Sequence, residues 1–184
     1  MKSLSGKLLI ASPQLRDPNF AQTVVLMIQH ETQGAFGLIL NRPGDKTVDE
    51  VWGLLGKESC DCDQTVYMGG PVPGPLIALH TVESLSDQEV LPGLYATAQA
   101  AAFDELIRSE REQEFRIYSG HAGWGDGQLE NELKVGGWLT HEAMVDDVFS
   151  NHESLWREVT SRIGLKILAP GLRPEQVPRD PGLN

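Results

Sequence analysis

The sequence predicts a single α+β domain built on a mixed, mainly antiparallel sheet flanked by helices. The apolar segments with strand character come mostly in consecutive pairs, and helical segments lie between the pairs instead of after every strand. This order favours an α+β fold over a doubly wound parallel sheet. No internal repeat or linker divides the 184 residues, and this length is typical of one domain. We expect one domain over residues 1–169 and a loosely held tail over residues 170–184, where proline and charge dominate.

The predicted strands are short apolar segments that end at turn-forming residues. Residues 22–30 (QTVVLMIQH) lack helical spacing and are rich in β-branched side chains, as in a buried strand. A hairpin-sized connection over residues 31–34 leads to an antiparallel partner over residues 35–40, which ends in the turn sequence Asn41-Arg42-Pro43-Gly44. The other predicted strands cover residues 7–12, 64–68, 75–80, 115–119 and 144–149.

The predicted helices carry start and stop signals. Thr47 and Glu50 have the spacing of a capping box at the start of a helix over residues 47–55. Asp126 is expected to cap a short helix over residues 128–135. Two further helices are predicted over residues 97–112 and 150–163.

Composition and charge exclude several classes of function. The formal net charge is −11, with 26 acidic against 15 basic residues and no basic run. Such a chain repels phosphate backbones, so binding to nucleic acid or to an anionic membrane is disfavoured. No apolar run reaches the length of a membrane span. The two cysteines, Cys60 and Cys62, do not form a disulfide framework, and we expect a cytoplasmic protein.

Residues 119–133 (SGHAGWGDGQLENEL) carry the most unusual local pattern, with four glycines around Trp124. Glycine is favoured where φ is positive or where two backbones approach closely. The segment has neither the GK[ST] ending of a phosphate loop nor the G-x-G-x-x-G order. Asp126 at the helix start would repel an anion. A tight turn with Trp124 packed on the backbone is therefore favoured over a ligand-binding loop.

Three histidines, His30, His80 and His121, stand at the ends of predicted strands. Three imidazoles with an open position could hold a catalytic zinc ion, but the spacing does not require it, and hydrogen-bonded histidines at the rim of the core are the favoured interpretation. The acidic neighbours of Cys60 and Cys62 would raise the pKa of a thiol and so make a reactive thiolate less available. We predict no metal and no other cofactor.

The turn at Asn41 supplies the best single candidate for a binding arginine, Arg42. A guanidinium is suited to carboxylate or phosphate recognition. The favoured alternative is structural: Asn41 bonds within its own turn, and Arg42 pairs with a surface acid. No nucleophile motif such as G-x-S-x-G or H-E-x-x-H occurs, so no catalytic residue is predicted.

Several of these stretches together resemble the bacterial YqgE/AlgH family in content and order. They are LLIASPQLRDPNFAQTVVLMIQH, GAFGLILNRP, MGGPV followed by a strand ending in LH, and GHAGWGDGQLENEL, within residues 6–138. The resemblance implies a single α+β domain with a strongly curved mixed sheet in a bacterial cytosolic protein. The family has no established catalytic activity, and its name includes a proposed transcriptional regulator.

The resemblance also implies a set of shared positions, mostly glycines and prolines with one packing tryptophan. Two positions depart from the family: His121 stands where tyrosine is usual, and Asp126 where proline is frequent. The shared positions are Asp17, Pro18, Phe20, His30, Gly34, Gly37, Asn41, Arg42, Pro43, Gly69, Gly70, Pro71, Gly123, Trp124, Gly127, Gln128, Leu129 and Glu130.

These observations favour a non-enzymatic interaction or regulatory module that acts through an unknown protein partner or a small ligand. One alternative is an enzyme whose site gathers four polar residues around the Gly69–Gly70 turn, namely His30, Asn41, Arg42 and Glu130. A second alternative is a transcriptional regulator that binds nucleic acid, which the net charge of −11 disfavours. The candidate binding surface consists of His30, Asn41, Arg42, Gly69, Gly70, Trp124, Gln128 and Glu130.

Overall fold

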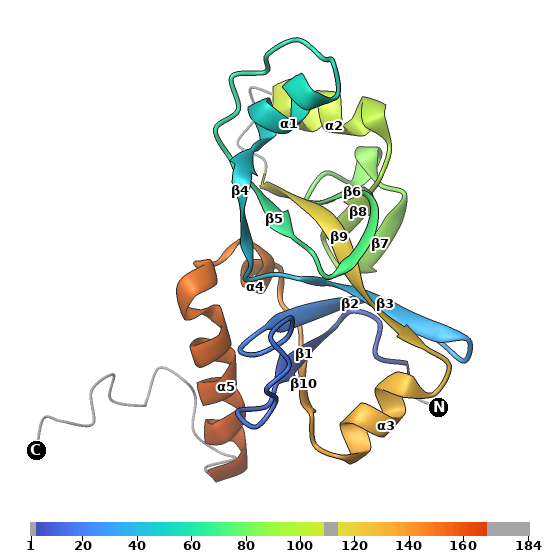
Figure 1. Ribbon diagram of the computed structural model, residues 1–184, viewed down its shortest axis with the longest axis vertical. Coiled ribbons are helices and arrows are strands. Elements are labelled where there is room, and N and C mark those ends of the chain that lie inside the picture. Colours follow the sequence, from blue (N-terminus) through green and yellow to red (C-terminus); the bar gives the residue numbers. More distant parts are fainter. Residues whose placement is uncertain (1–2, 109–113, 169–184) are drawn as a thin grey trace, which may run out of the picture.

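The computed structural model describes residues 3–108 and 114–168, so the predicted tail over residues 170–184 lies outside the described residues. Within these ranges the strands form one ten-stranded sheet in the order β10-β1-β2-β3-β9-β6-β8-β7, and β4 and β5 join it through β9. The sheet is strongly curved and helices cover it at both ends (Figure 1). Among the strand pairings of the described residues, only β5 with β9 is parallel. The predicted α+β fold with a mixed, mainly antiparallel sheet is therefore confirmed.

The elements follow the chain in alternating short groups of strands and helices. The strands are β1 (Lys7–Ala11), β2 (Val24–Glu31), β3 (Gly34–Ile39), β4 (Pro43–Thr47), β5 (Thr65–Met68), β6 (Val72–His80), β7 (Gln88–Leu91), β8 (Leu94–Thr97), β9 (Phe115–Gly125) and β10 (Trp138–Glu142). The helices are α1 (Val48–Leu54), the 3-10 turn η1 (Glu83–Leu85), α2 (Ala100–Arg108), α3 (Gln128–Lys134), α4 (Val145–Phe149) and α5 (His152–Leu168). No helix in the described ranges is both long enough and apolar enough to cross a bilayer.

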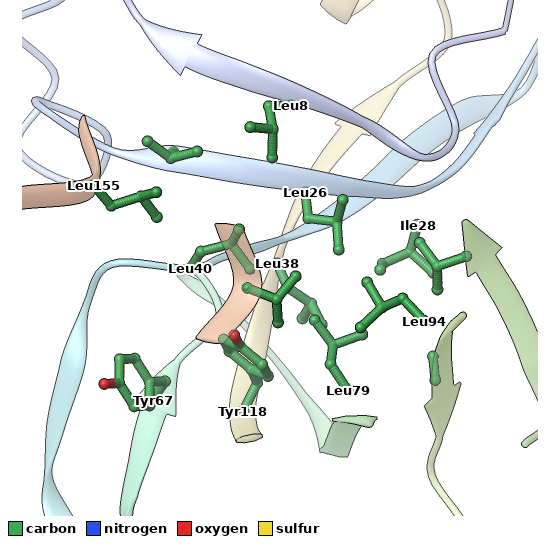
Figure 2. Packing of buried hydrophobic residues seen from close by; sticks show 14 of the residues in the cluster. Leu8, Leu26, Ile28, Leu38, Leu40, Tyr67, Leu79, Leu94, Tyr118 and Leu155 are labelled. Atoms are coloured by element: carbon green, nitrogen blue, oxygen red, sulfur yellow. The ribbon is translucent and has the colours of Figure 1, made fainter. Parts of the chain in front are cut away.

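Both faces of the central strands are buried, which explains their continuous apolar sequences. Leu8 and Ile10 of β1 face one core, and Leu9 and Ala11 face another, because neighbouring side chains in a strand point to opposite faces. The first core continues through Leu26, Leu38, Leu40, Leu79 and Tyr118 to Leu155 of α5 (Figure 2). A third core lies under α1 and α2 and contains Val48, Trp52, Val66, Ala78, Phe103, Leu106 and Ile117.

The helix after β4 begins as the sequence predicts. The Thr47 hydroxyl accepts a hydrogen bond from the Glu50 backbone amide at 3.2 Å, and the Glu50 carboxylate accepts one from the Thr47 amide at 2.8 Å. This capping box satisfies two backbone donors that would otherwise lack partners. Gly56 follows the helix at φ +74°, a conformation that glycine adopts without steric cost.

The strand predicted over residues 144–149 is wrong, because residues 145–149 form helix α4 and Met144 is its extended N-cap. Asp147 accepts a hydrogen bond from the Met144 backbone amide at 2.9 Å and pairs with Arg162 of α5. An acidic side chain in the first helical turn stabilises the helix start. These contacts outweigh the apolar character of the segment.

Four further strands, β4, β7, β8 and β10, were not expected. Pro43 and Gly44, predicted as part of a turn, begin β4, which is tolerated because β4 pairs only with β5 and an edge strand can lack one amide donor. The β7–β8 hairpin turns at Gly93, which has φ +81°. Each of its strands is only four residues long, so their sequence carries little strand signal. Of the helix predicted over residues 97–112, α2 covers residues 100–108, and residues 109–113 lie outside the described ranges.

The connection from β5 to β6 crosses over β9. Met68 pairs with Ser119 on one edge of β9, and Val72 pairs with His121 on the other edge. A side chain at Gly70 would place its Cβ 2.1 Å from the carbonyl carbon of His121, and φ at Gly70 is +156°. The chain can therefore make this crossing only where two backbones meet without side chains between them.

We expect Gly70→Ala to lower the free energy of unfolding by at least about 2 kcal/mol, because the added methyl group clashes with the β9 backbone and the conformation is unfavourable for alanine. The matched control is Gly53→Ala in α1, where no atom lies within 4 Å of the added Cβ. That control should raise stability by up to about 1 kcal/mol through its helix propensity. Urea denaturation compares the two variants, and equal midpoints would contradict the crossing constraint.

Candidate functional site

His30 and Glu130 form a buried contact between β2 and α3. The Nε2 atom of His30 lies 2.8 Å from Oε1 of Glu130, and the Leu4 backbone amide donates to Nδ1 at 3.0 Å. Because Nδ1 accepts a hydrogen bond, Nε2 carries the proton and donates it to the carboxylate. The His30 side chain is 3% exposed and that of Glu130 is 26% exposed. The pair joins the N-terminal segment, β2 and α3.

The environment of Glu130 favours its ionised form. Its pKa is lowered, first by a hydrogen bond from its own backbone amide at the start of α3 and then by His30. A shallow depression lies beside it between Thr32, Gly127 and Lys134. Both ring nitrogens of His30 are already engaged, so a structural role accounts for the pair.

Asn41 and Arg42 brace the loop that precedes β2. The Asn41 side chain accepts from the Val24 amide at 2.9 Å and donates to the Gln22 carbonyl at 2.9 Å. Arg42 Nη2 donates to the Ala21 carbonyl at 2.7 Å. The Asn41 side chain thus bonds to the segment that leads into β2 and not within its own turn, and Arg42 contacts a backbone carbonyl where a surface acid was expected, so both structural predictions are wrong.

The structure separates the four residues of the enzyme hypothesis. Val24, which Asn41 contacts, and His30 are six residues apart on β2, which corresponds to about 20 Å along a strand. His30 and Glu130 lie at one end and Asn41 and Arg42 at the other, so these side chains do not form one site. Gly69 lies between them, bonded to Ile39 and to Ser119.

The segment with four glycines and Trp124 continues as a strand instead of turning. β9 extends to Gly125, and its last residues pair with β3 from Gly34 to Gly37. The tight turn predicted there is wrong, and within β9 it is Gly120 that permits a close approach, because a Cβ there would lie 2.8 Å from the Gly70 carbonyl oxygen of the crossing chain. Trp124 is only 5% exposed, so it belongs to the core and not to an open surface.

One carboxylate holds the two tryptophans of this region. Glu132 Oε2 accepts from Trp124 Nε1 at 3.0 Å and from Trp138 Nε1 at 2.8 Å. Gln128 donates to the other oxygen of Glu132 at 2.9 Å and accepts from the Gly125 amide at 3.1 Å. Phe20 packs against both indoles. Trp124 is therefore part of the core, whereas Gln128 is exposed and its amide is already bonded to Glu132 and to Gly125.

Asp126 does not cap α3, contrary to the prediction. The cap position belongs to Gly127, which has φ +68°, and no side chain accepts a hydrogen bond there. Asp126 is exposed one residue earlier. The left-handed conformation at Gly127 sets the direction of the helix, and only glycine adopts it freely.

The three histidines predicted at strand ends lie on different strands and have separate partners, and His121 lies within β9 and not at its end. His80 is buried on β6, where its ring stacks on Tyr95 and burial lowers its pKa. His121 packs edge-on against Phe36. Within residues 3–108 and 114–168, no group of three or more His, Cys, Asp or Glu side chains is placed to hold a metal ion.

The two cysteines are free and half-buried. Burial, and then the neighbouring Asp49, raises the pKa of the Cys60 thiol. A raised pKa leaves less thiolate at neutral pH, so the thiol is poorly suited to nucleophilic or redox chemistry.

The sequence did not single out Arg116 and the two tyrosines beside it. Arg116 and Tyr118 lie two residues apart on β9 and so share one face, and Tyr67 pairs with Tyr118 from β5. The alternation of residues in FRIYS could have shown that Arg116 and Tyr118 share one face of the strand. That Tyr67 lies beside them depends on the pairing of β5 with β9, which the neighbouring sequence does not reveal.

Replacing Glu132 tests the role of the shared carboxylate. Glu132→Ala leaves two buried indole donors without an acceptor, and each costs roughly 1–3 kcal/mol. We expect a loss of about 2–4 kcal/mol, and a smaller loss for Glu132→Gln, whose amide oxygen still accepts. Urea unfolding followed by tryptophan fluorescence measures both. An alanine variant as stable as the wild type would contradict this role.

Acid titration tests the environment of Glu130. Its folded-state pKa is lowered, so its contribution to stability is present above the ordinary pKa of 4.5 and is lost as pH falls through the folded-state pKa. The stability difference between the wild type and Glu130→Gln should therefore shrink below about pH 4.5. Glu158→Gln, at an exposed position of α5, is the control. A difference that stays constant from pH 7 to pH 3 would contradict the assignment.

Comparisons with known proteins agree on one family. The AlgH-like family model matches residues 8–168. A UPF0301 protein of Chlorobaculum tepidum is 39% identical over 86% of this chain and 87% of its own, and one of Myxococcus xanthus is 38% identical over 90% and 93%. The solution structure of the AlgH protein from Pseudomonas aeruginosa has a TM-score of 0.76 and 32% identity over 94% of this chain and 99% of that one. With the curved sheet and the glycine crossing, these matches show that the chain belongs to the AlgH-like family.

Proposed function

We propose that this protein is a non-enzymatic interaction or regulatory module that works through contact with another protein. The observation that carries the proposal is an exposed apolar segment, Met68 to Pro75 (MGGPVPGP), at the crossing over β9. Met68 is 48% exposed and Val72 is 38% exposed. Residues 71–75 are exposed throughout.

This segment is rigid, which favours binding. Pro71, Pro73 and Pro75 each fix φ, and the chain is held against β9 through Gly69 and Val72. A surface that is already ordered loses little conformational entropy when a partner binds. Exposed apolar side chains on a rigid support are typical of contact surfaces between proteins.

The enzymatic alternative has less support. The polar side chains that suggested it hold the fold together: His30 with Glu130, and Asn41 and Arg42 with backbone groups. No pair of them forms a nucleophile with a base beside a cavity. We therefore favour contact with a partner protein over catalysis.

The nucleic-acid alternative is opposed by charge. The net charge of −11 makes association with a phosphate backbone unfavourable unless a local basic patch exists. A cytoplasmic location is part of the proposal and rests on the free Cys60 and Cys62.

The test compares affinity enrichment from bacterial lysate for the wild type, Met68→Gln/Val72→Thr, and Leu54→Gln/Leu55→Gln. The control pair removes two exposed leucines at the end of α1, which are 73% and 60% exposed. We expect a partner whose enrichment falls about tenfold for the first variant, which corresponds to about 1.4 kcal/mol, and is unchanged for the control.

Two results would overturn the proposal. One is that the wild type enriches no protein above background. The other is that both variants lose the same partner equally, because the loss would then reflect general surface polarity and not the segment at the crossing.

A further inference from the structure

A cavity of about 370 Å³ opens between β5, the start of β9 and α4. Its lining includes Tyr67, Glu114, Arg116 and Phe149. It belongs neither to the exposed segment at the crossing nor to the contact between His30 and Glu130. Its volume suits a small molecule or one end of a larger one.

Arg116 supplies the one guanidinium in this lining, and the Glu114 carboxylate lies in the same lining without forming an ion pair with it. Its Cζ lies 4.3 Å from the centre of the Tyr67 ring, and Nη2 donates to the Ser150 carbonyl at 3.1 Å. Nη1 is buried and has no hydrogen-bond partner. In the described part of the chain no carboxylate forms an ion pair with it, Glu114 included. A partly buried cation without an anion is unfavourable, so the site is complementary to negative charge.

Two phenol groups adjoin this guanidinium. Tyr118 is fully buried, and its hydroxyl lies beside the Arg116 guanidinium without a hydrogen bond of good geometry. Its ring centre lies 5.9 Å from that of Tyr67, and Figure 2 shows the two side chains next to each other at the edge of the core. Burial raises the pKa of Tyr118, and the charge of Arg116 and a side-chain hydrogen bond with it oppose this only in part, so the phenol keeps its proton.

His152 completes the group at the start of α5. Its Nδ1 lies 3.3 Å from the Tyr67 hydroxyl, and its ring packs edge-on against the Tyr67 ring. Tyr67 is thus held between Arg116 and His152. The hydrogen bond to His152 and the contact with Arg116 fix the position of the aromatic ring on which the guanidinium lies.

We propose that this cavity binds the oxyanion group of a small molecule, a carboxylate or a phosphate, with Arg116 as the charged donor and Tyr67 and Tyr118 as its supports. Glu114 in the lining would accept hydrogen bonds from the rest of the ligand and repel a second negative group. Polyanions are disfavoured by the net charge of −11. The ligand is therefore a metabolite with one anionic end and hydrogen-bond donors elsewhere.

The experiment is an NMR titration of the full chain with inorganic phosphate and, separately, with acetate, each at constant ionic strength set by chloride. The readouts are the Arg116 side-chain Nε–Hε resonance and the backbone amides around Ser150. We expect one anion to produce a saturable shift at these positions. Saturation by phosphate identifies a phosphate-type ligand, and saturation by acetate a carboxylate-type ligand.

Variants assign the effect to Arg116. Arg116→Gln should bind the same anion about tenfold or more weakly, since it loses a charged hydrogen bond. Arg157→Gln, at an exposed position of α5, should bind like the wild type. Arg116→Lys keeps the charge and provides a second test if the glutamine variant does not fold.

The proposal is overturned if neither anion gives a saturable shift in the wild type, because Arg116 and Tyr118 would then satisfy each other without a ligand. It is also overturned if Arg116→Gln binds as tightly as the wild type. Neither result bears on the exposed segment at the crossing, so this test is independent of the proposed protein contact.

Discussion

The structure depends on one close approach, where the chain from β5 to β6 passes over the backbone of β9. Gly70 lies against the peptide between His121 and Ala122, and Gly69 lies against the carbonyl of Gly120. Because of this crossing, β9 pairs with β5 and β6 in its first half and with β3 in its second half. The strand therefore belongs to both parts of the sheet, and the sheet curves around it (Figure 1).

Most polar side chains near the crossing complete the fold. His30 and Glu130 connect β2 with α3, Glu132 holds two indoles, and Asn41 satisfies a backbone donor and a backbone acceptor. A group whose hydrogen-bonding capacity is used internally is not free to bind a substrate. The set of residues that looks functional in the sequence is thus mainly a set of structural contacts.

The cavity beside Arg116 and the exposed segment at the crossing are not explained by folding, and β5 connects the two. Tyr67 points into the core toward Arg116, whereas Met68, the next residue, is exposed beside the crossing. This alternation follows from the pleat of a strand. The proposed oxyanion cavity and the proposed protein contact are therefore neighbours through two consecutive residues on opposite faces of one short strand.

The sequence by itself determined what depends on neighbouring residues: the capping box of Thr47 and Glu50, the buried character of β2 and the α+β order of elements. Only the tertiary structure decided which polar side chains form hydrogen bonds within the fold and which remain without such partners. His30 and Glu130 are 100 residues apart, and Tyr67 joins Arg116 through strand pairing. The segment of glycines around Trp124 became a strand because β3 and the crossing chain approach it from distant parts of the sequence. Local propensity contains no information about those distant partners. For this physical reason the predicted fold class is confirmed, whereas most residues of the predicted binding surface have structural contacts instead.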